Sequence, residues 1–151
     1  HGAHLIVDGT PMSKSRGNIV YPEDVYRSGY VTRDLRFFLF YTHYRNKLNY
    51  TEPCFRESCE QLKSFRNLAL GLCKQPRSDS TGNSRVKALI GDIQRVFKKH
   101  MDNDLGIGAA FDDIYAILES LAMIKSQITK KDASELENSL RKIDTVMAVI
   151  F

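Results

Sequence analysis

The helical spacing of apolar residues in the second half of the chain most strongly constrains its fold. Three apolar stripes recur at intervals of three and four residues, the pattern of a helix that buries one face. The stripes are Val86, Leu89, Ile90, Ile93 and Phe97; Ile107, Ala110, Phe111, Ile114, Leu118 and Leu121; and Leu136, Leu140, Ile143, Met147 and Ile150. Three such helices with short connections predict a small helical bundle. We expect Asp132 with Glu135 to form a capping box that starts the third helix.

The first part of the chain combines one short strand with further helices. His4–Val7 predicts a strand because it is apolar and partly β-branched, and Asp8-Gly9 predicts a turn after it. Residues 10–18 are expected to form an exposed loop. A short helix is predicted from Pro22, and a second helix from Thr32, a good capping residue, to about residue 43.

A long helix and a polar segment come next. Thr51 and Pro53 predict the start of a helix that continues to about Lys74. Residues 75–84 are polar, contain Pro and Gly, and therefore predict a linker. The expected fold class is mainly α, in four parts: residues 1–50 with the strand, the loop and two helices, 51–74 as a connecting helix, 75–84 as a linker and 85–151 as the bundle.

Composition and charge limit the functional classes. The 151 residues carry a formal net charge of +4, with 42% hydrophobic and 26% charged residues, as expected for an ordinary globular domain. The net charge is +3 over residues 1–50, +5 over 51–100 and −4 over 101–151. A basic front suggests a polyanionic partner, but without a motif solvated helix faces explain the charge better. Three cysteines cannot all pair in disulfides, and free thiols fit a reducing cytoplasm. No apolar run is long enough to span a membrane.

The loop at Met12–Asn18 carries the chemistry that the sequence suggests. Small hydroxylated residues flank Lys14 on a glycine-containing loop, which can turn backbone N–H groups toward a phosphate. A lysine ammonium stabilises the charge that grows on a departing pyrophosphate. From these residues alone, a basic surface loop without a ligand remains an open alternative, because short motifs often match by chance.

The context of this loop resembles the second signature region of class I aminoacyl-tRNA synthetases. That region has a Lys-Met-Ser-Lys-Ser loop after a short strand, usually followed by Gly-Asn, and here the loop reads Pro11-Met-Ser-Lys-Ser15 with Gly17-Asn18. Residues 35–39 (LRFFL), 42–45 (THYR) and 48–52 (LNYTE) are similar to cysteinyl-tRNA synthetases in particular. Residues 101–105 (MDNDL) and 140–147 (LRKIDTVM) are similar to their helical tRNA-side domain. The match is dense up to Glu52 and sparse after it.

The resemblance implies an activity and roles for residues of the loop. In such enzymes the cysteine carboxylate attacks the α-phosphate of ATP, and the cysteinyl group then passes to a cysteine tRNA. Lys14 would be the catalytic, ATP-binding lysine, Ser13 and Ser15 would shape the loop, and Met12 would anchor it. Pro11 replaces the first lysine of the motif, which removes one cation and stiffens the loop at that residue.

The resemblance also implies partners and missing parts. ATP with Mg²⁺, cysteine and tRNA would be the substrates, and the bundle would be a DALR-like domain that faces tRNA. Zinc is expected only in an N-terminal part that this chain lacks, and no metal site is expected here. Because the chain starts at His1 and ends in an apolar run, we expect it to be a piece of a longer protein. We expect that protein to be cytoplasmic and monomeric. Because the family's N-terminal catalytic part is missing, this fragment alone is expected to be inactive.

Basic residues are candidates for tRNA contacts, and acidic ones for caps. Arg45 follows the helix after the loop, while Arg56, Lys63 and Arg66 belong to the basic middle of the chain. All of them have the alternative of being solvated surface residues.

Four aspartates near residues 105–110 resemble a metal cluster in number, but we expect them to cap the helix that starts there. They are Asp102, Asp104, Asp112 and Asp113.

Three alternatives to a cysteine–tRNA ligase segment remain open. The first is a related ligase that joins cysteine to a small amine. The second is a non-catalytic tRNA- or RNA-binding module, which would bind with a steep salt dependence without making adenylate. The third is a helical interaction module with no nucleic-acid role.

Overall fold

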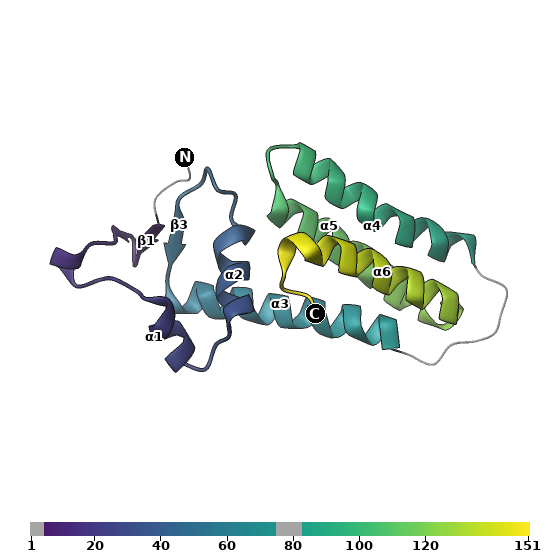
Figure 1. The fold of residues 1–151 in the computed structure, drawn as a ribbon, viewed down its shortest axis with the longest axis horizontal. Helices are drawn as coiled ribbons and strands as arrows, with labels where there is room; N and C mark the ends of the chain where they lie inside the picture. The colour runs from purple at the N-terminus through teal and green to yellow at the C-terminus, as the bar shows by residue number, and fades with distance from the viewer. Residues whose placement is uncertain (1–4, 75–82) are drawn as a thin grey trace. The chain divides into compact units, whose positions relative to one another are not determined.

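The computed structural model describes residues 5–74 and 83–151, and the fold is mainly helical, as predicted. The chain divides into two compact units, His1–Leu62 and Lys63–Phe151, which are described separately below (Figure 1). The division falls inside the long helix α3 (Glu52–Lys74). Residues 75–82 of the predicted linker lie outside the described residues, and its last residue, Ser84, begins helix α4. The four-part division proposed from the sequence stays a prediction.

A small sheet opens the first unit. Strands β1 (Leu5–Val7), β2 (Thr10–Pro11) and β3 (Leu48–Tyr50) lie in the order β2-β1-β3, with β2 antiparallel and β3 parallel to β1. Asp8 and Gly9 link β1 to β2 with φ angles of 47° and 76°, as a two-residue hairpin turn requires. Pro11 is tolerated because β2 is an edge strand. Neither β2 nor β3 was predicted, so the segment expected to be a simple exposed loop begins with a paired strand.

Helices α1 (Pro22–Arg27) and α2 (Thr32–Tyr41) complete the small core of this unit. Val25, Phe38 and Phe55 form that core, and the Tyr30 ring meets the Phe55 ring edge-on at 4.8 Å. The prediction that Thr32 caps α2 was wrong by one residue. Val31 is the N-cap, and its N–H donates to the Asp34 carboxylate at 3.0 Å, because an acidic side chain in the first turn can satisfy that N–H.

Helix α3 begins as the sequence predicts. The Cys54 N–H donates to Thr51 Oγ1 at 3.3 Å, and Pro53 occupies the first turn, where its missing N–H costs little. Phe55 and Leu62 of this helix are buried in the chain, as are Phe65, Ala69 and Leu72 further along.

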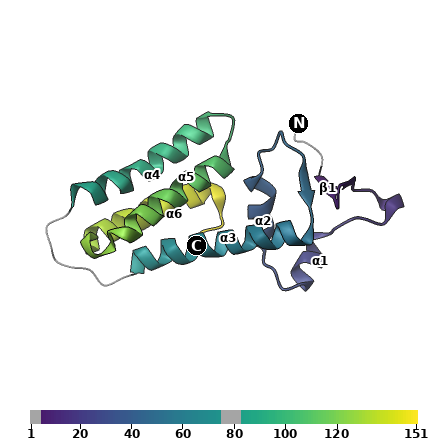
Figure 2. The same ribbon diagram turned by 180° about the vertical axis from the view of Figure 1, so that it is seen from behind.

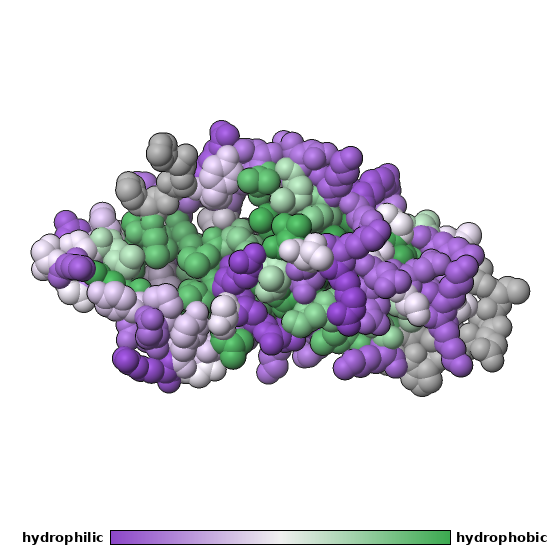
Figure 3. All heavy atoms as spheres, viewed as in Figure 1, coloured by the Kyte–Doolittle hydropathy of each residue, from purple (hydrophilic) through white to green (hydrophobic). Residues whose placement is uncertain are grey.

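The second unit is a helical bundle of α4 (Ser84–Asp102), α5 (Ile107–Met123), α6 (Lys130–Met147) and the second half of α3. Figures 1 and 2 show these helices running alongside one another. The three predicted stripes supply most of its core, and the Phe65 and Phe111 rings stack at 4.4 Å. In Figure 3 hydrophobic residues show between these helices, while the outer face of α4 is mostly hydrophilic. The predicted bundle is therefore confirmed.

The helix caps of the bundle correct two predictions. Thr129, not Asp132, is the N-cap of α6, and the Asp132 carboxylate accepts the Thr129 N–H at 2.9 Å, so that Glu135 has no part in the capping box. The aspartates near α5 do not cap it, since its N-cap is Gly106 and its first turn holds no acidic residue. The Asp113 carboxylate of α5 instead lies 2.7 Å from Nε2 of His100 on α4.

The C-terminal residues turn back after α6. Ala148 adopts a left-handed conformation, and the Asp144 carboxylate accepts the N–H groups of Val149 and Ile150 at 2.8 Å and of Phe151 at 3.1 Å. This turn places Val149 and Ile150 in the bundle core. Most of the terminal apolar run is therefore packed within the unit, whereas Ala148 and Phe151 are exposed.

Candidate functional site

The signature loop, residues 11–18, projects from the edge of the small sheet. It contains a single turn of 3₁₀-helix, η1 (Lys14–Arg16), closed by hydrogen bonds from Arg16 N to Ser13 O at 3.2 Å and from Gly17 N to Lys14 O at 3.1 Å. Gly17 ends the turn with φ 67°, a conformation that glycine adopts without steric cost. The motif is thus a compact turn rather than an extended loop.

The predicted ATP-binding residues share this turn. Lys14, Ser15 and Arg16 are exposed, so that the Lys14 ammonium can reach a ligand in solution. The Ser13 and Ser15 hydroxyls lie 2.8 Å apart, which fixes the two side chains on one side of the turn. Met12 is half-buried at the start of the loop, and its role in anchoring the loop stays a prediction.

The Asn18 carboxamide joins the two ends of the loop. Its Oδ1 accepts the Ser13 N–H at 2.9 Å, and its Nδ2 donates to Thr10 Oγ1 at 3.1 Å and to the Pro11 carbonyl at 3.2 Å. Thr10 Oγ1 in turn donates to the Val7 carbonyl at 3.0 Å. The loop is therefore tied to strand β1 through side chains.

Strand β3 holds the hairpin below the loop. The Gly9 N–H donates to Asn49 Oδ1 at 3.0 Å, and the Asp8 N–H donates to the Tyr50 carbonyl, also at 3.0 Å. Asn49 is not among the site residues predicted from the sequence. The only sequence feature that could have pointed to Asn49 is its place in the LNYTE segment. No local pattern reveals that its hydrogen-bond partner lies 40 residues away.

A carboxylate between two phenols fixes the start of α3 in the same unit. Tyr30 and Tyr50 donate their hydroxyls to Glu52 at 3.2 and 3.4 Å. Burial first, and then the neighbouring Glu52 carboxylate, raise the pKa of both tyrosines, so each remains a neutral donor. This cluster is a structural support and not a second reactive site.

Arg45 lies on the exposed turn after α2. Its Nε donates to the Tyr44 hydroxyl at 3.0 Å, and its guanidinium lies 5.5 Å from the centre of the Tyr44 ring. The His43 and Tyr44 rings pack at 4.8 Å. This arrangement leaves Arg45 at the surface but holds it against an aromatic ring.

The other predicted tRNA contacts occur on α3. Arg56 and Lys63 are exposed, whereas Arg66 is half-buried and its Nε donates to the Ile150 carbonyl at 2.8 Å. Arg66 therefore helps to hold the C-terminal turn of the bundle. The structure gives Arg56 and Lys63 the exposure that a phosphate contact needs.

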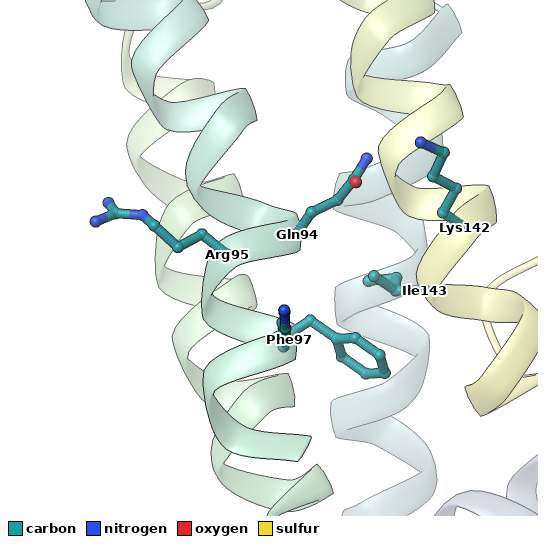
Figure 4. Close-up of a pocket in the computed structure, with 6 residues that line it drawn as sticks. Gln94, Arg95, Phe97, Lys142 and Ile143 are labelled. Carbon is teal, nitrogen blue, oxygen red and sulfur yellow. The ribbon is translucent and has the colours of Figure 1, made fainter. Parts of the chain in front are cut away.

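A shallow groove of about 340 Å³ runs between α4 and α6. Figure 4 shows the Phe97 ring directed toward Ile143, and Gln94 extending toward Lys142, while Arg95 points away. Gln94 Nε2 donates to Ser139 Oγ at 3.2 Å, and Arg95 pairs with Asp92 at 2.5 Å. Lys98 and Lys142 also line the groove. The groove has an apolar floor and cations at its edges, but no reactive group.

The cysteines and acidic residues offer no metal site among the described residues 5–74 and 83–151, where no three His, Cys, Asp or Glu side chains gather. Cys54, Cys59 and Cys73 are not joined in disulfides. Burial, followed by the nearby Asp34 carboxylate, raises the pKa of Cys59 to about 11. Over the same part of the chain, no helix has the length and apolar character needed to cross a membrane.

Comparison with known proteins identifies the segment. The family described as tRNA synthetases class I (C) catalytic domain matches residues 1–60, which include the whole signature loop. A cysteine–tRNA ligase of Chlamydia trachomatis serovar D is 31% identical over 162 aligned positions, covering 99% of this chain and 34% of the relative. The family model and the curated relatives together support a segment of a cysteinyl-tRNA synthetase.

Other members of this family give the same picture. The cysteine–tRNA ligases of Chlamydia muridarum and Koribacter versatilis are 29% and 26% identical, each over 99% of this chain. The chain spans about a third of the length of these curated relatives, 34% and 30% respectively. The similarity to these cysteine–tRNA ligases therefore extends through the bundle, beyond the residues 1–60 that the family model matches.

Proposed function

We propose that the protein containing this chain is a class I cysteine–tRNA ligase that activates cysteine with ATP and transfers it to tRNA. The observation that carries the proposal is the exposed Lys14 on a closed turn within the matched catalytic-domain region. The family relationship implies the use of ATP, and the relatives are named for cysteine and tRNA. We further propose that the enzyme is a monomer and works in the cytoplasm, where its three free thiols would stay reduced.

Lys14 would act on the nucleotide phosphates. When cysteine attacks the α-phosphate, negative charge grows on the departing pyrophosphate, and a nearby ammonium stabilises that charge most in the transition state. Ser13 and Ser15 would shape the turn and offer hydroxyl groups beside Lys14, while Met12 would anchor the start of the loop. Since Pro11 supplies no second cation, Lys14 would be the loop's chief contribution to pyrophosphate stabilisation.

The metals of the reaction would not be held by this chain. Residues 11–18 contain no carboxylate, so Mg²⁺ would arrive with the ATP phosphates instead of binding to the loop. The described residues also lack the Cys and His cluster that zinc requires. We therefore place zinc in a part of the enzyme outside this chain.

The surface cations would contact tRNA phosphates. Arg45, Arg56 and Lys63 are exposed, and the lysines at the edges of the α4/α6 groove suit a tRNA-facing, DALR-like bundle. Arg66 is the weakest of the predicted contacts because its Nε already binds the Ile150 carbonyl. Phosphate contacts of this kind position the tRNA without reading its bases.

The test is cysteine-dependent ATP–pyrophosphate exchange by the complete polypeptide, followed by cysteinyl transfer to tRNA. Exchange with cysteine and transfer to tRNA are the expected results. Exchange without transfer to tRNA, but with transfer to a small amine, would favour the related small-amine ligase. Tight, salt-dependent tRNA binding without any exchange would favour a non-catalytic RNA-binding protein. The present chain alone is expected to show no exchange.

A further inference from the structure

We propose that Asn18 is a positioning residue that latches the signature loop to its own starting strand and so presents Lys14 in a fixed orientation. This proposal rests on the proposed role of Lys14 in ATP activation. Asn18 is not expected to touch the nucleotide. It acts through the loop that carries the lysine.

The carboxamide of Asn18 is chemically suited to this latch. An amide side chain offers an acceptor oxygen and two N–H donors, and Asn18 uses both kinds of group. The oxygen holds Ser13, the residue before Lys14, and the nitrogen holds Thr10 and Pro11 on strand β2. Aspartate in this place would keep the acceptor but lose both donors, and alanine would lose all three bonds.

The latch connects to the core of the unit by a chain of hydrogen bonds. Asn18 donates to Thr10 Oγ1, and Thr10 Oγ1 donates to the carbonyl of Val7, a buried residue of β1. Hydrogen bonds in such a series strengthen one another. The orientation of the exposed turn at Lys14 thereby depends on its connection to Val7, the buried residue of β1.

Pro11 makes this latch more important for the reaction in the present chain. Proline donates no N–H, but its carbonyl remains an acceptor and receives Asn18 Nδ2 at 3.2 Å. The position where the family usually has the first lysine is thus used here as part of the latch. With a single motif lysine left, the reaction depends more heavily on how that lysine is placed.

The bonds of the latch are exposed or half-buried, so water competes for them and the loop can still adjust when ATP binds. Loss of the latch should therefore misplace Lys14 without removing it. Small misplacements of catalytic groups cost up to about a hundredfold in rate, and we expect Asn18→Ala to lower kcat by roughly ten- to a hundredfold. Asn18→Asp should lie between the wild type and Asn18→Ala.

The experiment uses the complete polypeptide with Asn18→Ala, Asn18→Asp and, as a matched control, Asn138→Ala on the exposed surface of α6. Steady-state exchange gives kcat and the KM for cysteine. Hydrogen exchange of the Ser13 amide, and tryptic cleavage after Lys14 and Arg16, report loop order independently of activity. The expected result for Asn18→Ala is a lower kcat, an unchanged KM for cysteine, and faster amide exchange and cleavage in the loop.

Two results would overturn the proposal. One is unchanged loop protection in Asn18→Ala, whatever happens to kcat, because a fall in rate without loosening would mean direct contact with the nucleotide. The other is a looser loop with unchanged kcat. If Asn18→Ala does not fold, Thr10→Val serves as the second variant. It removes the hydrogen bond between Asn18 Nδ2 and Thr10 Oγ1 and is judged by the same readouts.

Failure of the proposed function would look different. In that case the wild type itself would show no cysteine-dependent exchange, while hydrogen exchange would still report whether Asn18 latches the loop. Lys14→Met further separates failure of the latch from failure of the proposed function. It should abolish most activity and leave the Ser13 amide as protected as in the wild type.

Discussion

The signature loop and the helical bundle are held by different kinds of interaction. The loop depends on side-chain hydrogen bonds from Asn18, Thr10 and Asn49, most of them at the surface. The bundle depends on buried apolar contacts such as the stacked rings of Phe65 and Phe111. Surface hydrogen bonds exchange with water at little cost, whereas a packed core does not.

The difference suits what each region would do. A loop that delivers a cation to ATP must hold one orientation and still move, and a few exposed polar bonds permit both. A tRNA-facing bundle needs a stable surface, and its core provides that without any reactive group. Variants in the two regions should therefore separate loss of folding stability from loss of catalytic activity.

The largest expected effect is on the stability of the bundle. Phe111 is fully buried, and Phe111→Ala should lower the free energy of unfolding by about 3–5 kcal/mol, because the cavity is only partly refilled. Urea unfolding followed by circular dichroism measures this change. Met123→Ala is the control, since Met123 is 90% exposed and should change stability little. Equal losses in the two variants would contradict a core centred on Phe111.

The next effect is on chemistry alone. Lys14→Met should lower the rate of ATP–pyrophosphate exchange by about 10²–10³-fold, the usual cost of losing a group that stabilises transition-state charge. Unfolding should be unaffected because Lys14 is exposed. Arg16→Met, two residues further along the same turn and also exposed, is the matched control and should keep most of the activity. An unchanged rate in Lys14→Met would refute the role of the loop.

Most of the helical fold could be predicted from the sequence because its signals are local. The spacing of Phe111, Ile114 and Leu118 alone predicts a buried face, and all three are buried. The caps were harder, since several acceptors compete within one turn. Val31 and Thr129 are the N-caps where Thr32 and Asp132 were expected, and the Asp34 and Asp132 carboxylates accept the N–H groups of these capping residues.

The parts that could not be predicted depend on residues far apart in the chain. Strand β3 has three half-buried residues and forms only by pairing with β1, more than 40 positions earlier. Asn49 and Arg66 have partners 40 and 84 residues away, at Gly9 and Ile150. The roles proposed for Lys14 and its neighbours came from the family resemblance, since the loop residues by themselves also fit an unliganded surface loop.

A smaller effect is expected on tRNA binding. Arg56→Glu combined with Lys63→Glu should weaken tRNA affinity by roughly tenfold and reduce the slope of log Kd against log salt by about two, one for each phosphate contact. Filter binding across a salt series measures both quantities. Lys125→Glu, an exposed change of the same charge type, is the control. A slope that stays the same in the double variant would mean that these residues are only solvated surface.

The smallest effect concerns the thiols of α3, the helix that both units share. Burial raises the pKa of Cys59 from its ordinary value of 9.0 to about 11, so at pH 8 its reactive thiolate is scarce. Exposed Cys54 should therefore be alkylated by iodoacetamide at least about tenfold faster, as measured by mass spectrometry of the intact helix peptide.

The same shift has a defined sign for stability. Because the folded chain favours the neutral Cys59 thiol, the stabilisation from its packing is fully present below pH 9.0 and is lost as the pH rises toward about 11. Cys59→Ala should remove this alkaline dependence, while Cys54→Ala should keep it. Equal alkylation of the two cysteines at pH 8 would show that the start of α3 opens readily. The contrast between a polar, adjustable loop and firmly packed helices would then hold only for the bundle.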